Sequence, residues 1–446
     1  MKINLNSCAY RLIILSLFSI LSACGGGSDS GTQTNGSPTS VTPPITPPIT
    51  PPITPPVSPP VTPPTVQLTV ATMEFAQTHV IPEMGLSWAT PNDTETLHLV
   101  GGRDALALVT IGQGDVQRPV LEVSRNGVSL GSLPLNSPSS LPPSEANGIP
   151  YATNQWSVNV PGFWLSVGSS FKVSSANYSS SVSHSPVIGL DSDVLLHILP
   201  FYLFGANDSN SLPFATTNAP SVTVQSELSS KWPVATLLVD SVGKANWSKL
   251  VVRPRNDSNN VAQPAYVMTA WDQQQDSGAA ASAVLGLLSA FRQANGEAQT
   301  NNQYYGLMVP LDSAGKYQLP GLGLGIVGGG AGVGGSRFLG LMLHELGHGF
   351  GLDHAGDAYK SGKYPYVGGS LKGSVWGYDV SHNEFLNTLI PSNASSYANC
   401  ASSHQIDAGG RCYKQDPMEG GAGDQAAGYT YAMHADFYVG QKFNDG

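Results

Sequence analysis

Residues 344–354 read His344-Glu345-Leu-Gly-His348-Gly-Phe-Gly351-Leu-Asp-His354, and this stretch decides how the second half of the chain folds. Two histidines four positions apart lie on one face of a helix, so both imidazole rings can reach one ion. Gly351 tolerates the positive φ that the chain needs to leave the helix and serves as a hinge. Beyond that hinge, His354 can return to the same ion. The spacing therefore predicts three nitrogen ligands for one metal ion.

The same stretch predicts a reaction. Three protein ligands leave a fourth coordination position open, which separates catalytic zinc sites from structural ones. Zinc lowers the pKa of water towards 7 and polarises a carbonyl group. Glu345 lies one step round the helix, where it can act as general base and pass a proton to a leaving amine. We expect one catalytic Zn²⁺ and a hydrolase acting on peptide bonds; another borderline divalent ion stays open as the metal.

Charge and composition exclude other function classes. The 446-residue chain has 20 Lys+Arg and 30 Asp+Glu, a net charge of −10, which argues against a nucleic-acid partner and against electrostatic docking on anionic lipid. Charged residues make up only 11% of the chain, whereas hydrophobic residues make up 41%, enough to form a core.

The N-terminus carries an export signal. Lys2 and Arg11 accompany an apolar run at residues 12–21, which is too short to span a bilayer and fits a signal peptide at residues 1–23. The run ends in Leu-Ser-Ala-Cys24, which resembles a bacterial lipobox with a lipidated cysteine. Gly25 after it implies outer-membrane sorting. We expect an exported protein that is lipid-anchored to the bacterial outer membrane or cell surface, and the sequence does not indicate which face of that membrane it occupies. The alternative is an ordinary signal peptide with an incidental cysteine.

The chain then divides into three parts. Residues 24–65 contain the lipidated cysteine and a predicted stalk. The stalk is predicted because residues 43–64 repeat Pro-Pro-[Ile/Val]-[Thr/Ser], which favours extended polyproline II. Residues 66–228 contain short β-branched runs and a hairpin signal at Asn126-Gly127, which predict an all-β, sandwich-like domain. Residues 229–446 include a helical spacing of Val284, Leu287, Leu288 and Phe291. The predicted fold is multidomain, with the all-β domain followed by an α+β zinc peptidase domain.

A glycine-rich segment precedes the predicted metal helix. Residues 323–328 fit G-x-G-x-x-G, but no βαβ frame surrounds them, so they do not indicate a dinucleotide site. We expect a loop or edge segment whose backbone approaches another part of the molecule closely. Four histidines of the β-rich region are scattered and are interpreted as satisfied or exposed side chains: His79, His98, His184 and His197.

Two cysteines remain after export, Cys400 and Cys412, and only one pairing is possible. An oxidising compartment favours a disulfide between them. Metal ligation by these cysteines is the weaker alternative, because no C-x-x-C spacing is present.

The eleven-residue pattern resembles that of the metzincin clan of zinc endopeptidases, and the chain resembles the StcE/TagA-like secreted zinc metalloprotease family, in a lipoprotein form. The similar stretches are residues 73–79, 327–335, 376–379 and 416–421, together with the cysteine pair. This resemblance implies a metzincin-like peptidase domain, a turn containing Met418 beneath the metal, and O-glycoprotein (mucin-like) substrates.

The resemblance assigns no role to Trp376 or Asp379. Asp379 can orient a ligand or serve folding alone, and Tyr378 can stabilise an oxyanion. The chain departs from some relatives at Ala355, where they carry tyrosine, and it stops at Gly446, so we expect no further C-terminal module. Two other functions stay open, an adhesive lipoprotein that binds glycans or protein and a protease that processes envelope proteins. The sequence predicts neither the cleavage site nor the oligomeric state.

Overall fold

The computed structural model describes residues 66–441, apart from residues 92–93 and 258. The predicted signal peptide, the lipidation site Cys24 and the stalk lie outside the described residues. The described residues belong to one compact unit. Among the described residues, none of the helices has the length and apolar character needed to cross a bilayer.

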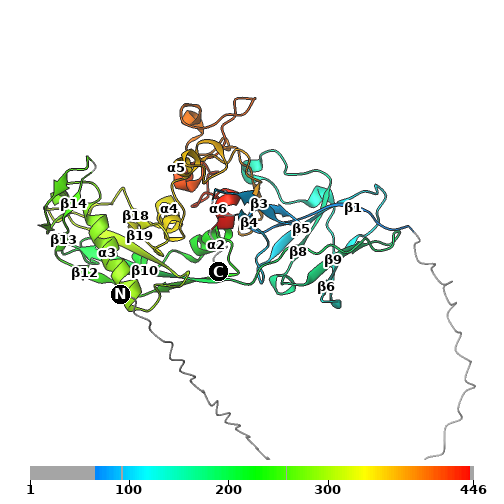
Figure 1. Ribbon diagram of the computed structural model, residues 1–446, viewed down its shortest axis with the longest axis horizontal. Coiled ribbons are helices and arrows are strands. Elements are labelled where there is room, and N and C mark those ends of the chain that lie inside the picture. Colours follow the sequence, from blue (N-terminus) through cyan, green and yellow to red (C-terminus); the bar gives the residue numbers. More distant parts are fainter. Residues whose placement is uncertain (1–65, 92–93, 258, 442–446) are drawn as a thin grey trace, which may run out of the picture. The chain divides into compact units, whose positions relative to one another are not determined.

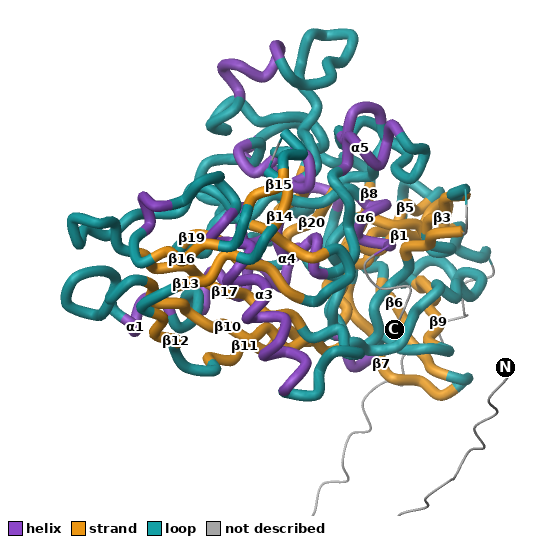
Figure 2. Tube along the Cα trace, turned by 60° about the vertical axis from the view of Figure 1, so that its left-hand side comes forward, coloured by secondary structure: helices purple, strands orange, loops and turns teal. Residues whose placement is uncertain are grey.

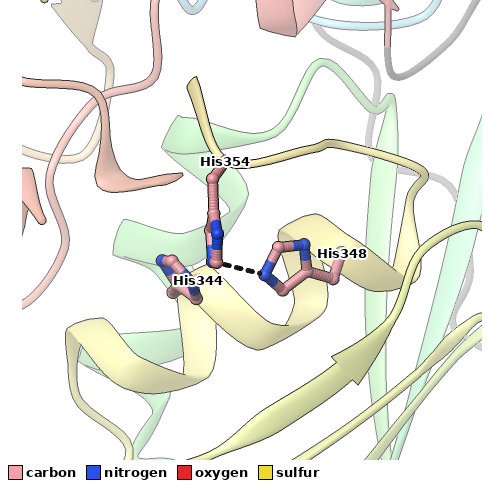
Figure 3. A group of neighbouring side chains, drawn as sticks. All are labelled: His344, His348 and His354. Atoms are coloured by element: carbon pink, nitrogen blue, oxygen red, sulfur yellow. Dashed lines mark hydrogen bonds between the residues drawn. The ribbon is translucent and has the colours of Figure 1, made fainter. Parts of the chain in front are cut away.

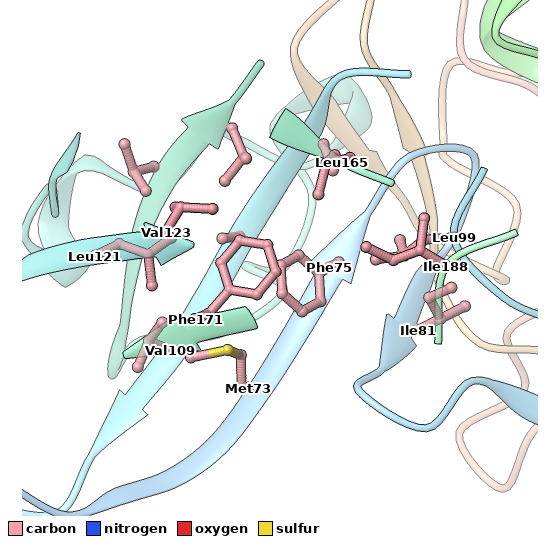
Figure 4. Close-up of a cluster of buried hydrophobic side chains, with 14 of the residues drawn as sticks. Met73, Phe75, Ile81, Leu99, Val109, Leu121, Val123, Leu165, Phe171 and Ile188 are labelled. Carbon is pink, nitrogen blue, oxygen red and sulfur yellow. The ribbon is translucent and has the colours of Figure 1, made fainter. Parts of the chain in front are cut away.

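The β-rich region consists of two antiparallel sheets that share one hydrophobic core (Figure 4). One sheet has the strand order β2-β1-β5-β8 and the other has the order β7-β6-β9. Phe75 of β1 packs against Phe171 of β9 across the interface, with ring centroids 5.1 Å apart. This arrangement agrees with the sandwich-like prediction. The strands are β1 (Val70–Ala76), β2 (Val80–Pro82), β5 (Ala105–Ile111), β6 (Val120–Arg125), β7 (Val128–Pro134), β8 (Gln155–Val160) and β9 (Ser169–Ser174), with a separate hairpin of β3 (Leu86–Ala89) and β4 (Thr94–Leu97).

The predicted hairpin at Asn126-Gly127 joins β6 to β7. Asn126 has φ 50° and Gly127 has φ 82°. Positive φ at both central residues is the requirement of a type I′ turn, whose twist matches that of the flanking strands. The hairpin prediction is confirmed.

The second region is built on a six-stranded sheet (Figures 1 and 2). Its order is β11-β10-β17-β19-β18, and β12 also pairs with β10. All pairs are parallel except that of the outer strand β18 with β19. The strands are β10 (Asp193–Leu203), β11 (Thr236–Ser241), β12 (Ala245–Trp247), β17 (Gln303–Pro310), β18 (Leu324–Ile326) and β19 (Ala331–Gly335).

The strand β10 lies before the predicted boundary at residue 228 and belongs to this second sheet. It is almost continuously buried, as expected of a strand covered on both faces. Pro200 is tolerated inside it because β10 pairs with β11 up to Ile198 and with β12 only from Phe201. The second region therefore includes β10, which lies on the N-terminal side of the predicted boundary.

Helices cover both faces of the six-stranded sheet. Alternate residues of a strand point to opposite faces. Tyr304 and Met308 of β17 pack with α3 (Ala279–Ala294), whereas Tyr305 and Leu307 pack with α4 (Gly340–Gly349). In α3, Val284 and Leu288 are buried as predicted, but Phe291 is 41% exposed. The other helices are α1 (Phe214–Thr217), α2 (Val222–Lys231), α5 (Ala355–Lys360) and α6 (Asp436–Gln441), and the smaller ladders are β13 (Leu250–Val252) with β16 (Tyr266–Met268), β14 (Arg255–Asn256) with β15 (Ala262–Gln263) and β20 (Gly377–Asp379) with β21 (Glu384–Leu386).

The last helix, α6, returns to the β-rich region. Val439 belongs to the core that the two antiparallel sheets share. Phe437 packs edge-on against Trp88 of β3, with ring centroids 5.6 Å apart. Both regions therefore contribute to one packed unit.

The glycine-rich hairpin of β18 and β19 lies directly against α4. A Cβ on Gly325 would come within 2.5 Å of the Glu345 carbonyl oxygen, and a Cβ on Gly332 within 2.9 Å of Glu345 Cβ. The predicted close backbone approach is confirmed, and its partner is the helix that carries the histidines.

Replacing Gly325 with alanine is expected to destabilise the protein by about 1–3 kcal/mol, because the new methyl group meets helix backbone that cannot move away. Gly321→Ala is the matched control, since a Cβ there has no neighbour within 4 Å. Urea unfolding of both variants measures the difference. Equal stability of the two variants would show that the hairpin and α4 are not in close contact.

Candidate metal centre

Three histidines converge at the C-terminal end of α4 (Figure 3). His344 and His348 belong to α4, and His354 is the residue that precedes α5. One candidate ligand atom from each ring lies within 4.8 Å of the others. The closest pair is His348 Nε2 and His354 Nε2, which are 3.3 Å apart. The structure thus brings together the three side chains that the sequence spacing predicts.

The end of α4 has the conformation expected of a glycine hinge. Gly351 has φ 94°, a value that favours glycine. Its N–H donates to the His348 carbonyl at 2.8 Å, and the Leu352 N–H donates to the Gly347 carbonyl at 3.0 Å. These bonds close the helix in the usual left-handed termination and direct the chain back toward His354.

Backbone carbonyls orient two of the three rings. His344 Nδ1 donates to the Pro417 carbonyl at 2.8 Å, and His348 Nδ1 donates to the Leu352 carbonyl at 2.7 Å. A carbonyl accepts only, so the proton lies on Nδ1 and each Nε2 carries a lone pair. Burial also lowers the pKa of both rings, which favours the neutral form that binds metals.

The donor set fits a divalent cation. The lone pair of His348 Nε2 faces His354 Nε2, and a cation between them satisfies both nitrogens. Zinc–nitrogen distances of about 2.0–2.1 Å in a tetrahedral site place two ligand nitrogens about 3.3 Å apart. The 3.3 Å separation in the structure matches that requirement.

Glu345 lies on the same helix as the first two histidines and is 5% exposed. Its surroundings are the glycine backbone of the β18–β19 hairpin. Burial raises the pKa of this carboxyl to about 8. A cation nearby lowers such a pKa again. A carboxyl whose pKa is near the working pH can both accept and release a proton.

Met418 lies in the short turn η7 (Pro417–Glu419), which packs against α4. Its side chain is fully buried, and its sulfur occupies the space next to Gly347, between the two helical histidines. The Asp416 carboxylate begins the turn by accepting the Met418 N–H at 2.9 Å. Met418 therefore packs against the helix that carries His344 and His348.

A chain of hydrogen bonds connects this turn to the β-rich region. Asp416 accepts from His434 Nδ1 at 3.1 Å and from the Ala435 N–H at 2.7 Å. The His434 carbonyl in turn accepts from His79 Nε2 at 3.0 Å. His79 is 2% exposed, so it is a satisfied core histidine, as interpreted from the sequence.

His79 should make stability depend on pH, because burial lowers its pKa from 6.5 to about 4. Between these values the unfolded chain binds more protons, so the free energy of unfolding falls as the pH falls from 6.5 to 4. Over this range the free energy of unfolding should fall by about 3 kcal/mol. Urea unfolding across this range measures the change, and His79→Gln should flatten the dependence of the free energy of unfolding on pH. An unchanged slope in His79→Gln would contradict this origin.

Trp376, Tyr378 and Asp379 lie in or beside β20, and their contacts are with residues other than the three histidines. The Tyr378 hydroxyl donates to Asn383 at 2.7 Å, and its ring packs with Phe385. Trp376 packs edge-on against Tyr151, with ring centroids 5.5 Å apart. In the described part of the chain, these contacts do not include the three histidines, so the structure does not bring Tyr378 to the metal centre.

Asp379 forms a fully buried ion pair with Lys231 of α2 and accepts a hydrogen bond from Ser381. Burial raises the pKa of this carboxyl, but Lys231 and the hydrogen bonds outweigh burial and hold the pKa well below its usual range. These contacts join α2 to β20. They describe a folding role for Asp379.

The predicted disulfide between Cys400 and Cys412 is present, and it packs with Ile390 and Ala394. The groups that orient the rings, the carbonyls of Pro417 and Leu352, are not predicted from the sequence. Backbone groups occur at every residue, so no residue type in the sequence marks them.

The described site has the arrangement expected of a metallopeptidase: two histidines on one helix, a third behind a glycine hinge and a neighbouring glutamate. Residues 145–443 match the family described as peptidase M66, and the chain belongs to this family. This membership agrees with the expected metallopeptidase class, and the three histidines offer a site for a metal ion.

Several relatives align with most of the chain. Dictomallein of Burkholderia pseudomallei (strain 1710b) is 54% identical over 432 residues, which is 95% of this chain and 63% of the relative. Dictomallein of Burkholderia mallei (strain SAVP1) is 53% identical over the same span. Dictomallein-1 of Dictyostelium discoideum is 42% identical over 373 residues, 83% of this chain and 61% of the relative. The chain therefore spans less than two thirds of the length of these relatives.

Proposed function

We propose that this chain cleaves peptide bonds inside protein substrates with one Zn²⁺ held by His344, His348 and His354. The observation that carries the proposal is the pair of Nδ1 hydrogen bonds to backbone carbonyls, which leaves Nε2 of His344 and His348 free to face one ion together with His354. A zinc ion bound there supplies Lewis acidity toward water and toward a peptide carbonyl.

Glu345 is the general base of this proposal. Its carboxylate takes the proton of the attacking water and delivers it to the nitrogen of the departing amine. The glycine hairpin shields the carboxylate from solvent, and this burial raises its pKa, whereas a bound cation lowers it.

The outer strand β18 is the proposed docking edge for the substrate backbone. It ends the strand order of its sheet in the described chain, and its Gly325 lies next to His348. The free side of an edge strand offers N–H and C=O groups to an extended peptide. A peptide paired with β18 passes the metal centre in extended form, which suits cleavage within a chain.

The proposed substrates are O-glycoproteins of the mucin type, and the proposed location is the bacterial cell surface. The substrate class is supported by the family resemblance. The location is supported by the lipobox-like sequence at Cys24 and the proline-rich segment that follows it.

The test uses one protein in O-glycosylated and enzymatically deglycosylated forms, each incubated with the full chain, with the chain plus chelator, and after zinc is restored. The expected result is cleavage of the glycosylated form, lost with chelator and recovered with zinc. Equal cleavage of both forms would reject the glycoprotein preference. Binding without cleavage, unaffected by chelator, would favour the adhesive alternative.

A further inference from the structure

The turn η7 contacts three separate parts of the metal centre through three consecutive residues. The Pro417 carbonyl accepts from His344 Nδ1. The Met418 sulfur packs at Gly347 of α4. The Glu419 carboxylate reaches the segment after the third histidine, where Oε2 accepts the Gly356 N–H at 2.7 Å.

His354 differs from the other two histidines in how it is held. In the described chain, no backbone carbonyl anchors its ring, whose nitrogen contact is with His348 Nε2. Its orientation therefore depends on the position of its own backbone. His354 precedes the first residue of α5, and its side chain does not cap that helix because the ring turns toward the other histidines.

Glu419 supplies the missing cap. The first N–H groups of a helix have no partner within the helix and need an acceptor from elsewhere. Gly356 is the second residue of α5, and its N–H is such a group.

Two glycines leave the space that the Glu419 side chain occupies. A Cβ on Gly356 would collide with the Glu419 carboxylate. A Cβ on Gly369 would lie 2.8 Å from both Glu419 Cγ and the Gly356 nitrogen. The half-buried Glu419 side chain therefore fits a space that these two glycines leave open.

We propose that Glu419 is a positioning residue for the third metal ligand. By accepting the Gly356 N–H, it fixes the backbone that follows His354, and so fixes the direction of the His354 ring. This inference rests on the proposed zinc site, and its consequence is that the turn holding Met418 also sets the affinity for the metal.

The experiment measures zinc affinity of the full chain by competition with a chromophoric chelator. Glu419→Ala should bind zinc about 10–100-fold more weakly, the usual effect of removing a partner that orients a ligand. Glu419→Gln keeps an oxygen acceptor and should stay close to wild type. Asp357→Ala is the control, because it removes an acid of α5 that is exposed and contacts Lys360 instead. Gly356→Ala should weaken binding as Glu419→Ala does.

Unfolding of the metal-free proteins is measured in parallel. Weaker zinc binding in Glu419→Ala than in Asp357→Ala, at equal metal-free stability, supports the proposal. Unchanged zinc affinity in Glu419→Ala would overturn it, even if its metal-free stability falls. Glu419→Gln binding as weakly as Glu419→Ala would also overturn it. Failure of the wild-type chain to bind zinc would overturn the proposed function itself.

Discussion

Replacing Glu345 with glutamine is expected to remove peptide hydrolysis while one zinc ion per chain stays bound. Glutamine has nearly the same size as glutamate, so it fits the space beside Gly323 that the carboxylate occupies. It cannot accept the proton of the attacking water. Loss of a general base costs about 10²–10⁴-fold in rate.

Kinetics and metal analysis of the same preparation check this prediction. The loss should appear in kcat and in kcat/KM alike, because the carboxylate acts in the transition state and not in substrate binding. Glu122→Gln, in β6 of the other region, is the matched control and should keep full activity. Full activity of Glu345→Gln, with contaminating proteases excluded, would rule out the proposed mechanism.

Replacing His348 with alanine is expected to remove the metal itself. The ring is 8% exposed, its Nδ1 is fixed by the Leu352 carbonyl, and its Nε2 lies 3.3 Å from His354 Nε2. Two ligands in place of three leave the ion bound weakly. Changes in groups that only orient a ligand cost about 10–100-fold in affinity, so loss of the ligand should cost more.

Zinc content after dialysis against a weak chelator measures this loss, and activity should fall with it. His98→Ala is a suitable control, because His98 Nδ1 also contacts a backbone carbonyl, that of Leu99, away from the cluster. Zinc retained at one ion per chain in His348→Ala would contradict the ligand set. Glu345→Gln and His348→Ala together separate loss of the base from loss of the metal.

The parts of the site that could be predicted are local in sequence. His344, His348, Gly351 and His354 lie within eleven residues, where helical spacing and one hinge fix their relation. The turn at Asn126-Gly127 was predictable for the same reason. The disulfide was predictable because only Cys400 and Cys412 lie beyond the predicted signal peptide and lipidation site.

The parts that could not be predicted depend on contacts between distant positions. Lys231 and Asp379 are 148 positions apart, and Lys414 and Glu145 are 269 apart, yet both pairs are buried. The sequence shows each as an ordinary charged residue. Ion pairs of this kind join the segments around the site and cannot be read from local periodicity.

The assignment of β10 depends on topology in the same way. Its apolar residues predict a buried strand wherever it lies, but not which sheet it joins. Its parallel pairing with β17 is set by the crossover through α3, far along the chain. A domain boundary inferred from local sequence patterns therefore misplaces β10, which precedes residue 228 but pairs with strands that follow it.

X-ray absorption at the zinc edge of the purified full chain measures the proposed coordination itself. We expect one zinc ion with three imidazole nitrogens and one further light atom at about 2.0–2.1 Å. A zinc shell with fewer than three imidazoles, or with sulfur, would contradict it.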